Sequence, residues 1–101
     1  MATLHEFVHR FEDVSQYGTL SIDLDPPDDA VIRIDQESGG KVWLSANQEG
    51  WNHLARICAE LGGANFEAGY HFHRDPQFGD SEGNGPEITF EMRPDRDSAP
   101  T

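Results

Sequence analysis

The sequence predicts an α+β domain in which an antiparallel sheet of about five strands carries one main helix on one face. One segment repeats its apolar residues with the helical period, several short segments alternate apolar and polar residues, and turn-forming residues separate them. A chain of 101 residues is long enough for one domain with its own core. We expect this domain at residues 1–93 and a disordered tail at residues 94–101.

The main helix is predicted at about residues 47–62. Its apolar side chains recur at helical spacing and form one stripe: Trp51, Leu54, Ala55, Cys58 and Leu61. Either Ser45 or Asn47 supplies the N-cap, and the pair Gly62 and Gly63 ends the helix. A helix of this length is marginal alone in water, so we expect neighbouring strands to bury the stripe.

Five segments are predicted to be strands because apolar and polar residues alternate along them and turn-forming residues bound them. They are residues 20–24, 30–35, 41–45, 69–73 and 87–92. Residues 3–14 fit a short N-terminal helix, and a strand is the alternative. Besides the helix stripe, the residues expected in the core are Ile22, Leu24, Ile32, Ile34, Val42, Leu44, Tyr70, Phe72, Ile88, Phe90 and Met92.

The chain is strongly acidic, with 19 acidic and seven basic side chains and a net charge of −12. This charge disfavours nucleic acids and anionic membranes as partners, since both are bound by clustered lysine and arginine. It favours a basic protein partner that is steered electrostatically, although solubility alone also explains an acidic surface. One cysteine excludes an internal disulfide framework, and no apolar run reaches the roughly 18 residues of a membrane span. We expect a cytoplasmic protein.

Nucleophilic catalysis has little support in the sequence. Cys58 lies within the predicted apolar stripe, where its thiol would stay protonated and inert. The nucleophile elbow, the phosphate-binding loop and the dinucleotide fingerprint are absent. We therefore expect that the protein is not an enzyme.

His71 and His73 lie two residues apart on a predicted strand, so both side chains leave the same face. With Asp75 they give the alternative prediction, a metal-binding domain that acts as a hydrolase, because zinc takes about three or four such ligands. No second histidine pair and no cysteine pair lies at a ligand spacing. Two surface histidines on a half-buried strand are the simpler interpretation, so the leading prediction includes no metal and no cofactor.

Two further features are candidates for partner binding. The polar loop at residues 75–86 carries Asp80 and Glu82, and it lacks the ordered ligand series of a calcium loop. Trp43 alternates with its apolar neighbours and either faces outward as an interface anchor or is covered by residues 3–14. The predicted partner-binding residues are Trp43, His71, His73, Asp75, Asp80 and Glu82.

The order of motifs in the second half of the chain is similar to that of a known family. The helix Gly50-Trp51-x-x-Leu54-Ala55-x-x-Cys58-x-x-Leu61 is followed by Gly69-Tyr70-His71-Phe72-His73-Arg74-Asp75 and then by a strand that contains E-I-T-F. Over residues 41–92 this order resembles small immunity proteins of bacterial polymorphic toxin systems, which carry a similar His-x-His segment after a helix. The resemblance implies an intracellular inhibitor that binds its cognate toxin by surface complementarity, without catalysis.

These observations predict a non-catalytic, acidic protein-binding domain that neutralises a basic partner such as a bacterial toxin. A third hypothesis is a domain that self-associates through an exposed sheet face. The sequence leaves the oligomeric state open.

Overall fold

The computed structural model describes residues 2–79 and 86–94, which form a small α+β fold. The elements in order are η1 (Ser15–Tyr17), β1 (Ile32–Gln36), β2 (Val42–Ala46), α1 (Gln48–Gly63), β3 (His71–Arg74) and β4 (Ile88–Glu91). Within these residues, β1 pairs with β2 and β3 pairs with β4, each time antiparallel, in two separate two-stranded sheets. The α+β class is confirmed, whereas the single sheet of about five strands is wrong.

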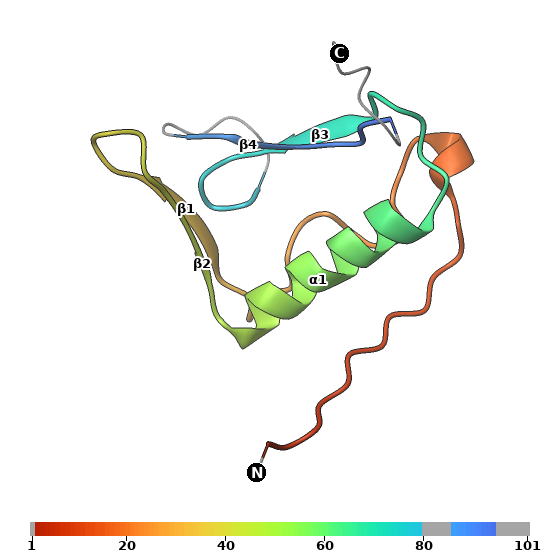
Figure 1. Cartoon of the computed structure of the whole chain (residues 1–101), viewed down its shortest axis with the longest axis horizontal. Helices are drawn as coiled ribbons and strands as arrows, with labels where there is room; N and C mark the ends of the chain where they lie inside the picture. Colours follow the sequence, from red (N-terminus) through yellow and green to blue (C-terminus); the bar gives the residue numbers. More distant parts are fainter. Residues whose placement is uncertain (1, 80–85, 95–101) are drawn as a thin grey trace, which may run out of the picture.

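The β1–β2 hairpin, the β3–β4 hairpin and α1 lie around a common interior (Figure 1). The buried core cluster contains one or two apolar side chains from each of several segments: Leu20, Ile32, Leu54, Ile57 and Phe78. The β3–β4 hairpin packs against this cluster through two aromatic rings. The ring of Phe72 on β3 stacks on that of Phe90 on β4 at 4.9 Å, and Phe90 meets Phe78 edge-on. Phe78 is fully buried, so the loop at residues 75–86, which the sequence predicts to be polar, supplies one side chain to the core.

α1 begins and ends close to the predicted bounds, but it buries a different face. The buried residues are Gly50, His53, Leu54, Ile57 and Glu60. Trp51 is 46% exposed and Cys58 is exposed, so their assignment to the core is wrong. The reason is that Ile57 faces the core. Adjacent helix residues lie about 100° apart around the axis, so Cys58, the next residue, is turned toward solvent. Asn47 caps the helix, because its side chain accepts a hydrogen bond from the Gly50 amide.

Residues 20–24 do not form the predicted strand, although their inward and outward alternation is correct. Leu20 is buried, and Ile22 and Leu24 pack against the core cluster. The Ser21 amide, however, donates to the carboxylate of Glu60 and not to a neighbouring strand. The alternation therefore records the apolar face of an irregular segment beside α1.

Residues 3–14 are neither the predicted helix nor the alternative strand. They form an irregular segment that runs beside the outer side of α1, in red and orange (Figure 1). Leu4 and Val8, which a helix would place on one stripe, are largely exposed. His9 instead reaches Glu60, and the Phe7 ring lies under the Arg56 guanidinium at 5.7 Å. Contacts with α1 thus determine the path of this segment.

β2 is the most exposed strand, in contrast to the prediction that Val42 and Leu44 lie in the core. Val42 is 60% exposed and Leu44 is 40% exposed, while Ile32 and Ile34 on the paired strand are buried. With no third strand beside β2 in the described part of the chain, its apolar side chains extend past the core. Among residues 2–79 and 86–94, no helix has the length and apolar character required to cross a bilayer.

Candidate functional site

The two predicted histidines lie on the outward face of the β3–β4 hairpin. His71 and His73 alternate with Phe72, which faces the core, so the shared face predicted for them is confirmed. Their rings meet edge-on with centroids 5.2 Å apart. The Nδ1 atom of His71 lies 2.8 Å from the Gly69 carbonyl oxygen, and that of His73 lies 2.8 Å from the Thr89 hydroxyl. Both rings are therefore oriented by contacts within their own hairpin.

Asp75 does not join the histidines as a third ligand. Its Oδ1 atom accepts hydrogen bonds from the amides of Gln77 at 2.9 Å and Gly79 at 2.7 Å, which close the turn after β3. In the part of the chain that the structure describes, no group of three or more potential ligands could hold a metal ion. Asp80 and Glu82, the remaining predicted residues of this region, lie outside the described residues.

Trp43 lies on the other hairpin and faces outward. Its cross-strand partner on β1 is Asp35, whereas the neighbouring Leu44 pairs with the buried Ile34 on the opposite face. Trp43 is 57% exposed, so residues 3–14 do not cover it as the alternative supposed. Of the predicted partner-binding residues that the structure describes, Trp43 thus lies on the outer face of the β1–β2 hairpin and His71 and His73 lie on that of the β3–β4 hairpin. Asp75 lies in the turn after β3.

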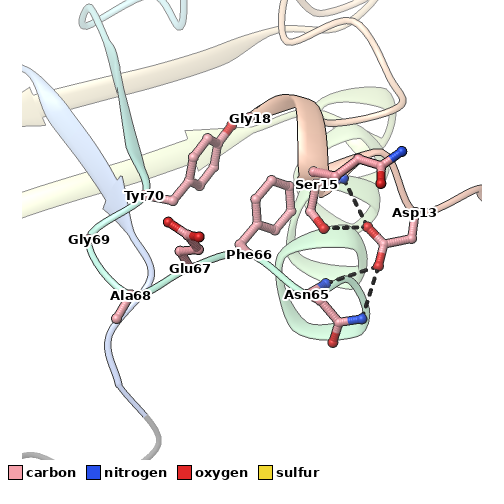
Figure 2. A pocket seen from close by; sticks show the side chains of 10 residues that line it. Asp13, Ser15, Gly18, Asn65, Phe66, Glu67, Ala68, Gly69 and Tyr70 are labelled. Atoms are coloured by element: carbon pink, nitrogen blue, oxygen red, sulfur yellow. Dashed lines mark hydrogen bonds between the residues drawn. The ribbon is translucent and has the colours of Figure 1, made fainter.

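An open recess of about 810 Å³ lies between η1 and the segment that links α1 to β3 (Figure 2). Its upper part is formed by the ring of Tyr70, which stacks on Phe66 at 4.3 Å. Burial raises the pKa of Tyr70, so its phenol remains protonated at neutral pH. The carboxylate of Glu67 lies beside these rings, which gives the recess a mixed aromatic and acidic lining.

Asp13, at the edge of this recess, fastens two segments together. Its carboxylate accepts hydrogen bonds from the Ser15 amide and hydroxyl and from the Asn65 amide and side chain (Figure 2). These hydrogen bonds, that of the Ser15 hydroxyl above all, lower the pKa of Asp13. The contacts with Ser15 close a local turn, and those with Asn65 join this segment to the chain after α1, so the Asp13 carboxylate acts as a structural group.

A second carboxylate, that of Glu60, is buried on the face of α1 that points away from solvent, and the apolar stripe predicted from the sequence does not include it. Glu60 is 1% exposed and accepts hydrogen bonds from the Ser21 amide at 2.7 Å and the Ser21 hydroxyl at 2.8 Å. The amide reaches Oε1 and the hydroxyl reaches Oε2, and His9 Nε2 lies 2.6 Å from Oε2 as well. Desolvation alone would raise the pKa of Glu60, but the hydrogen bonds and the charge of His9 together lower it.

The sequence contained a signal for Glu60, which is its helical spacing. Ile57 and Glu60 are three residues apart, and His53 precedes Ile57 by four, so all three share one face of α1. His53 is buried as well, with its Nε2 atom 3.0 Å from the Leu24 carbonyl oxygen and its ring edge-on to Phe78. A serine, a histidine and a glutamate do meet at Glu60. The Ser21 hydroxyl donates to the Glu60 carboxylate, and His9 contacts the same carboxylate, so this arrangement differs from one in which a histidine accepts the serine proton.

No protein-family model, curated protein or solved structure matches the chain.

Proposed function

We propose that the protein is a non-catalytic, acidic protein-binding domain that neutralises a basic protein, such as a toxin, in the cytoplasm. The observation that carries the proposal is the combination of a net charge of −12 with an exposed tryptophan on an exposed apolar strand. Trp43 and its neighbours Val42 and Leu44 are all at least 40% exposed. Tryptophan is one of the residue types enriched at the energetic centres of protein interfaces.

Charge and aromatic contact play different parts in this proposal. The acidic surface raises the association rate because it attracts a basic protein before contact. Added salt screens this attraction and lowers the rate. Trp43 then slows dissociation because its large apolar surface is removed from water in the complex. The resemblance of residues 41–92 to immunity proteins supports an inhibitory role for this binding.

The experiment measures association kinetics with the product of the neighbouring gene at several salt concentrations. We expect the association rate to fall by about tenfold or more between about 0.05 and 0.5 M salt, because the screening length shortens over this range. An association rate that does not change with salt would refute electrostatic steering. A product that does not bind at any salt concentration would refute the pairing itself.

The residue that holds the complex is tested by two matched substitutions on the two hairpins. We expect Trp43→Ala to weaken binding by about tenfold or more, mainly through faster dissociation. The sequence analysis names His73 as a partner-binding residue too, but its ring lies on the other hairpin. If β2 is the surface that holds the partner, His73→Ala should change affinity by less than about threefold. Surface plasmon resonance with both variants gives the comparison. A large effect of His73→Ala with none of Trp43→Ala would move the binding site to the other hairpin.

A further inference from the structure

Within residues 2–79 and 86–94, the outer edge of β2 has backbone amides and carbonyls that pair with no strand, and the pairing of the hairpin shows which ones. Beyond the strand ends, the Glu37 amide donates to the Lys41 carbonyl at 2.8 Å and the Asn47 amide donates to the Val31 carbonyl at 3.1 Å. Directly opposed residues of an antiparallel pair alternate between bonded and non-bonded. Trp43 and Ser45 therefore bond to β1, and the backbone groups of Val42, Leu44 and Ala46 point away from it.

The two edges of this hairpin differ in what covers them. On the β1 side, the Ile34 amide donates at 2.8 Å to the carbonyl oxygen of Pro76, so the turn after β3 covers that edge. On the β2 side, no strand in the described part of the chain pairs with Val42–Ala46. Natural proteins usually protect such edges with charged residues, proline or a bulge. The sequence of β2, VWLSA, contains no charged residue and no proline.

We propose that the β2 edge binds an extended segment of a basic protein, which adds a third strand to the β1–β2 sheet. This inference rests on the proposed function and names the surface and the binding mode. An added strand would satisfy the outward amides and carbonyls of Val42, Leu44 and Ala46. Its side chains would alternate, with one set facing Val42 and Leu44 and the other set beside Trp43.

Charge selects the chemistry of the added strand. On the inner face Val42 and Leu44 are uncharged and exposed, so they fit apolar side chains. On the outer face the cross-strand partner of Trp43 is Asp35. The indole ring and the carboxylate together favour an arginine or lysine side chain that lies over the ring. Arg33 lies one pair further along this face, opposite Ser45. A second copy of this chain fits less well, because it would bring another net charge of −12 to the edge.

The probe is a capped peptide of about eight residues in which valine and arginine alternate, measured by calorimetry against the full chain. Two versions carry N-methyl groups, either on the valine amides or on the arginine amides. Alternate amides of a strand point to opposite edges, so we expect only one version to lose binding, by about tenfold or more. Loss with methylated valine indicates an antiparallel strand and loss with methylated arginine a parallel strand, and either outcome supports the site.

Equal affinity of the two methylated peptides, whether both retain or both lose binding, would overturn strand addition. A peptide that does not bind at low salt would also overturn it. Neither result removes the proposed function, which is judged separately by the salt-dependent kinetics with the neighbouring-gene product. If that product does bind while the methylated peptides behave alike, the partner uses another surface.

Hydrogen exchange gives an independent test within one strand. On peptide binding we expect the amides of Val42, Leu44 and Ala46 to exchange at least about tenfold more slowly. Those of Trp43 and Ser45 bond to β1 already and serve as the control. Sedimentation without peptide tests the other occupant: a dimer that protects the same three amides would assign the edge to a second copy and overturn the basic strand.

A pair of substitutions completes the test. Leu44→Lys places on the edge the charge that commonly blocks strand pairing, and it should weaken peptide binding by about tenfold or more. Val31→Lys introduces the same charge at another exposed apolar residue, outside β2, and its effect should stay within about threefold. Equal effects of the two substitutions would indicate simple repulsion of a basic peptide and would overturn the edge site.

Discussion

The two ends of α1 are attached to the rest of the protein by different physical means. At the first end the attachment depends on backbone geometry and volume: the Asn47 side chain accepts hydrogen bonds from Val31 and Gly50, and α1 lies very close to β1. At the second end it depends on a buried charge, since Glu60 binds His9 and Ser21. We therefore expect that the first attachment is sensitive to side-chain size and the second to pH.

Gly50 is the position where the first attachment breaks most readily, and Gly50→Ala should have the largest effect. A β-carbon at this position would overlap the Val31 carbonyl oxygen and lie 2.9 Å from both Ala46 and Ile32. We expect the free energy of unfolding to fall by about 1–3 kcal/mol in urea titrations followed by circular dichroism. This is a net loss, because the steric overlap costs more than the roughly 1 kcal/mol by which alanine usually stabilises a helix relative to glycine.

Gly62 is the matched control for this substitution, because it lies in the same helix with no atom within 4 Å of the added carbon. Gly62→Ala should leave the free energy of unfolding unchanged or raise it by up to about 1 kcal/mol. If Gly50→Ala proved as stable as Gly62→Ala, the close approach of α1 to β1 would be wrong.

Glu60→Gln tests the second attachment and should have an intermediate effect. The substitution keeps the shape but removes the charge that accepts hydrogen bonds from His9 and Ser21, so we expect a loss of about 1–2 kcal/mol near pH 7. Glu67→Gln, at an exposed position, should change the free energy of unfolding by less than about 0.5 kcal/mol. Urea titrations of both variants make this comparison.

The pH dependence of this difference has a defined sign. The pKa of Glu60 is lowered in the folded protein, so its carboxylate stabilises the fold above its ordinary value of 4.5. This stabilisation is lost as the pH falls below 4.5 and through the lowered pKa. The advantage of the native chain over Glu60→Gln should therefore shrink below pH 4.5, while the contribution of Asp13 is common to both. An advantage that stays constant down to pH 2.5 would exclude a charge-dependent attachment.

Local signals in the sequence predicted the elements that are determined by near neighbours. Asn47 and the two terminal glycines gave the bounds of α1 to within about a residue, and the alternation around His71 and His73 gave their shared outward face. The failures concern contacts between distant segments. Alternation at residues 20–24 reports which side chains point inward, but it does not report whether the backbone finds a partner strand.

The buried face of α1 shows the same limit for the candidate site. Ile57 and Cys58 are adjacent and both apolar, so an apolar stripe can be drawn through either of them. Choosing Cys58 placed Glu60 on the solvent side and hid its network with Ser21. The outward direction of Trp43 was one of two alternatives, because it depended on where residues 3–14 run.

Cys58 provides the test of this register with the smallest effect on stability. Its thiol is exposed in the folded protein, so a maleimide reagent should modify it at a rate within about tenfold of that for the unfolded chain. A buried thiol would react only when the structure opens, which typically slows modification by about 10³-fold or more. Modification should change the free energy of unfolding by less than about 0.5 kcal/mol, because the side chain contacts solvent.

Moving the thiol by one residue supplies the contrast between the two faces of α1. The double variant Ile57→Cys with Cys58→Ser carries its only thiol at a position that is fully buried in the native chain. Because that position faces the core, we expect its modification to be slowed by about 10²-fold or more relative to Cys58, with helix content checked by circular dichroism. Equal rates at the two positions would mean that α1 is rotated relative to the core, and the buried network of Glu60 would then lose its basis.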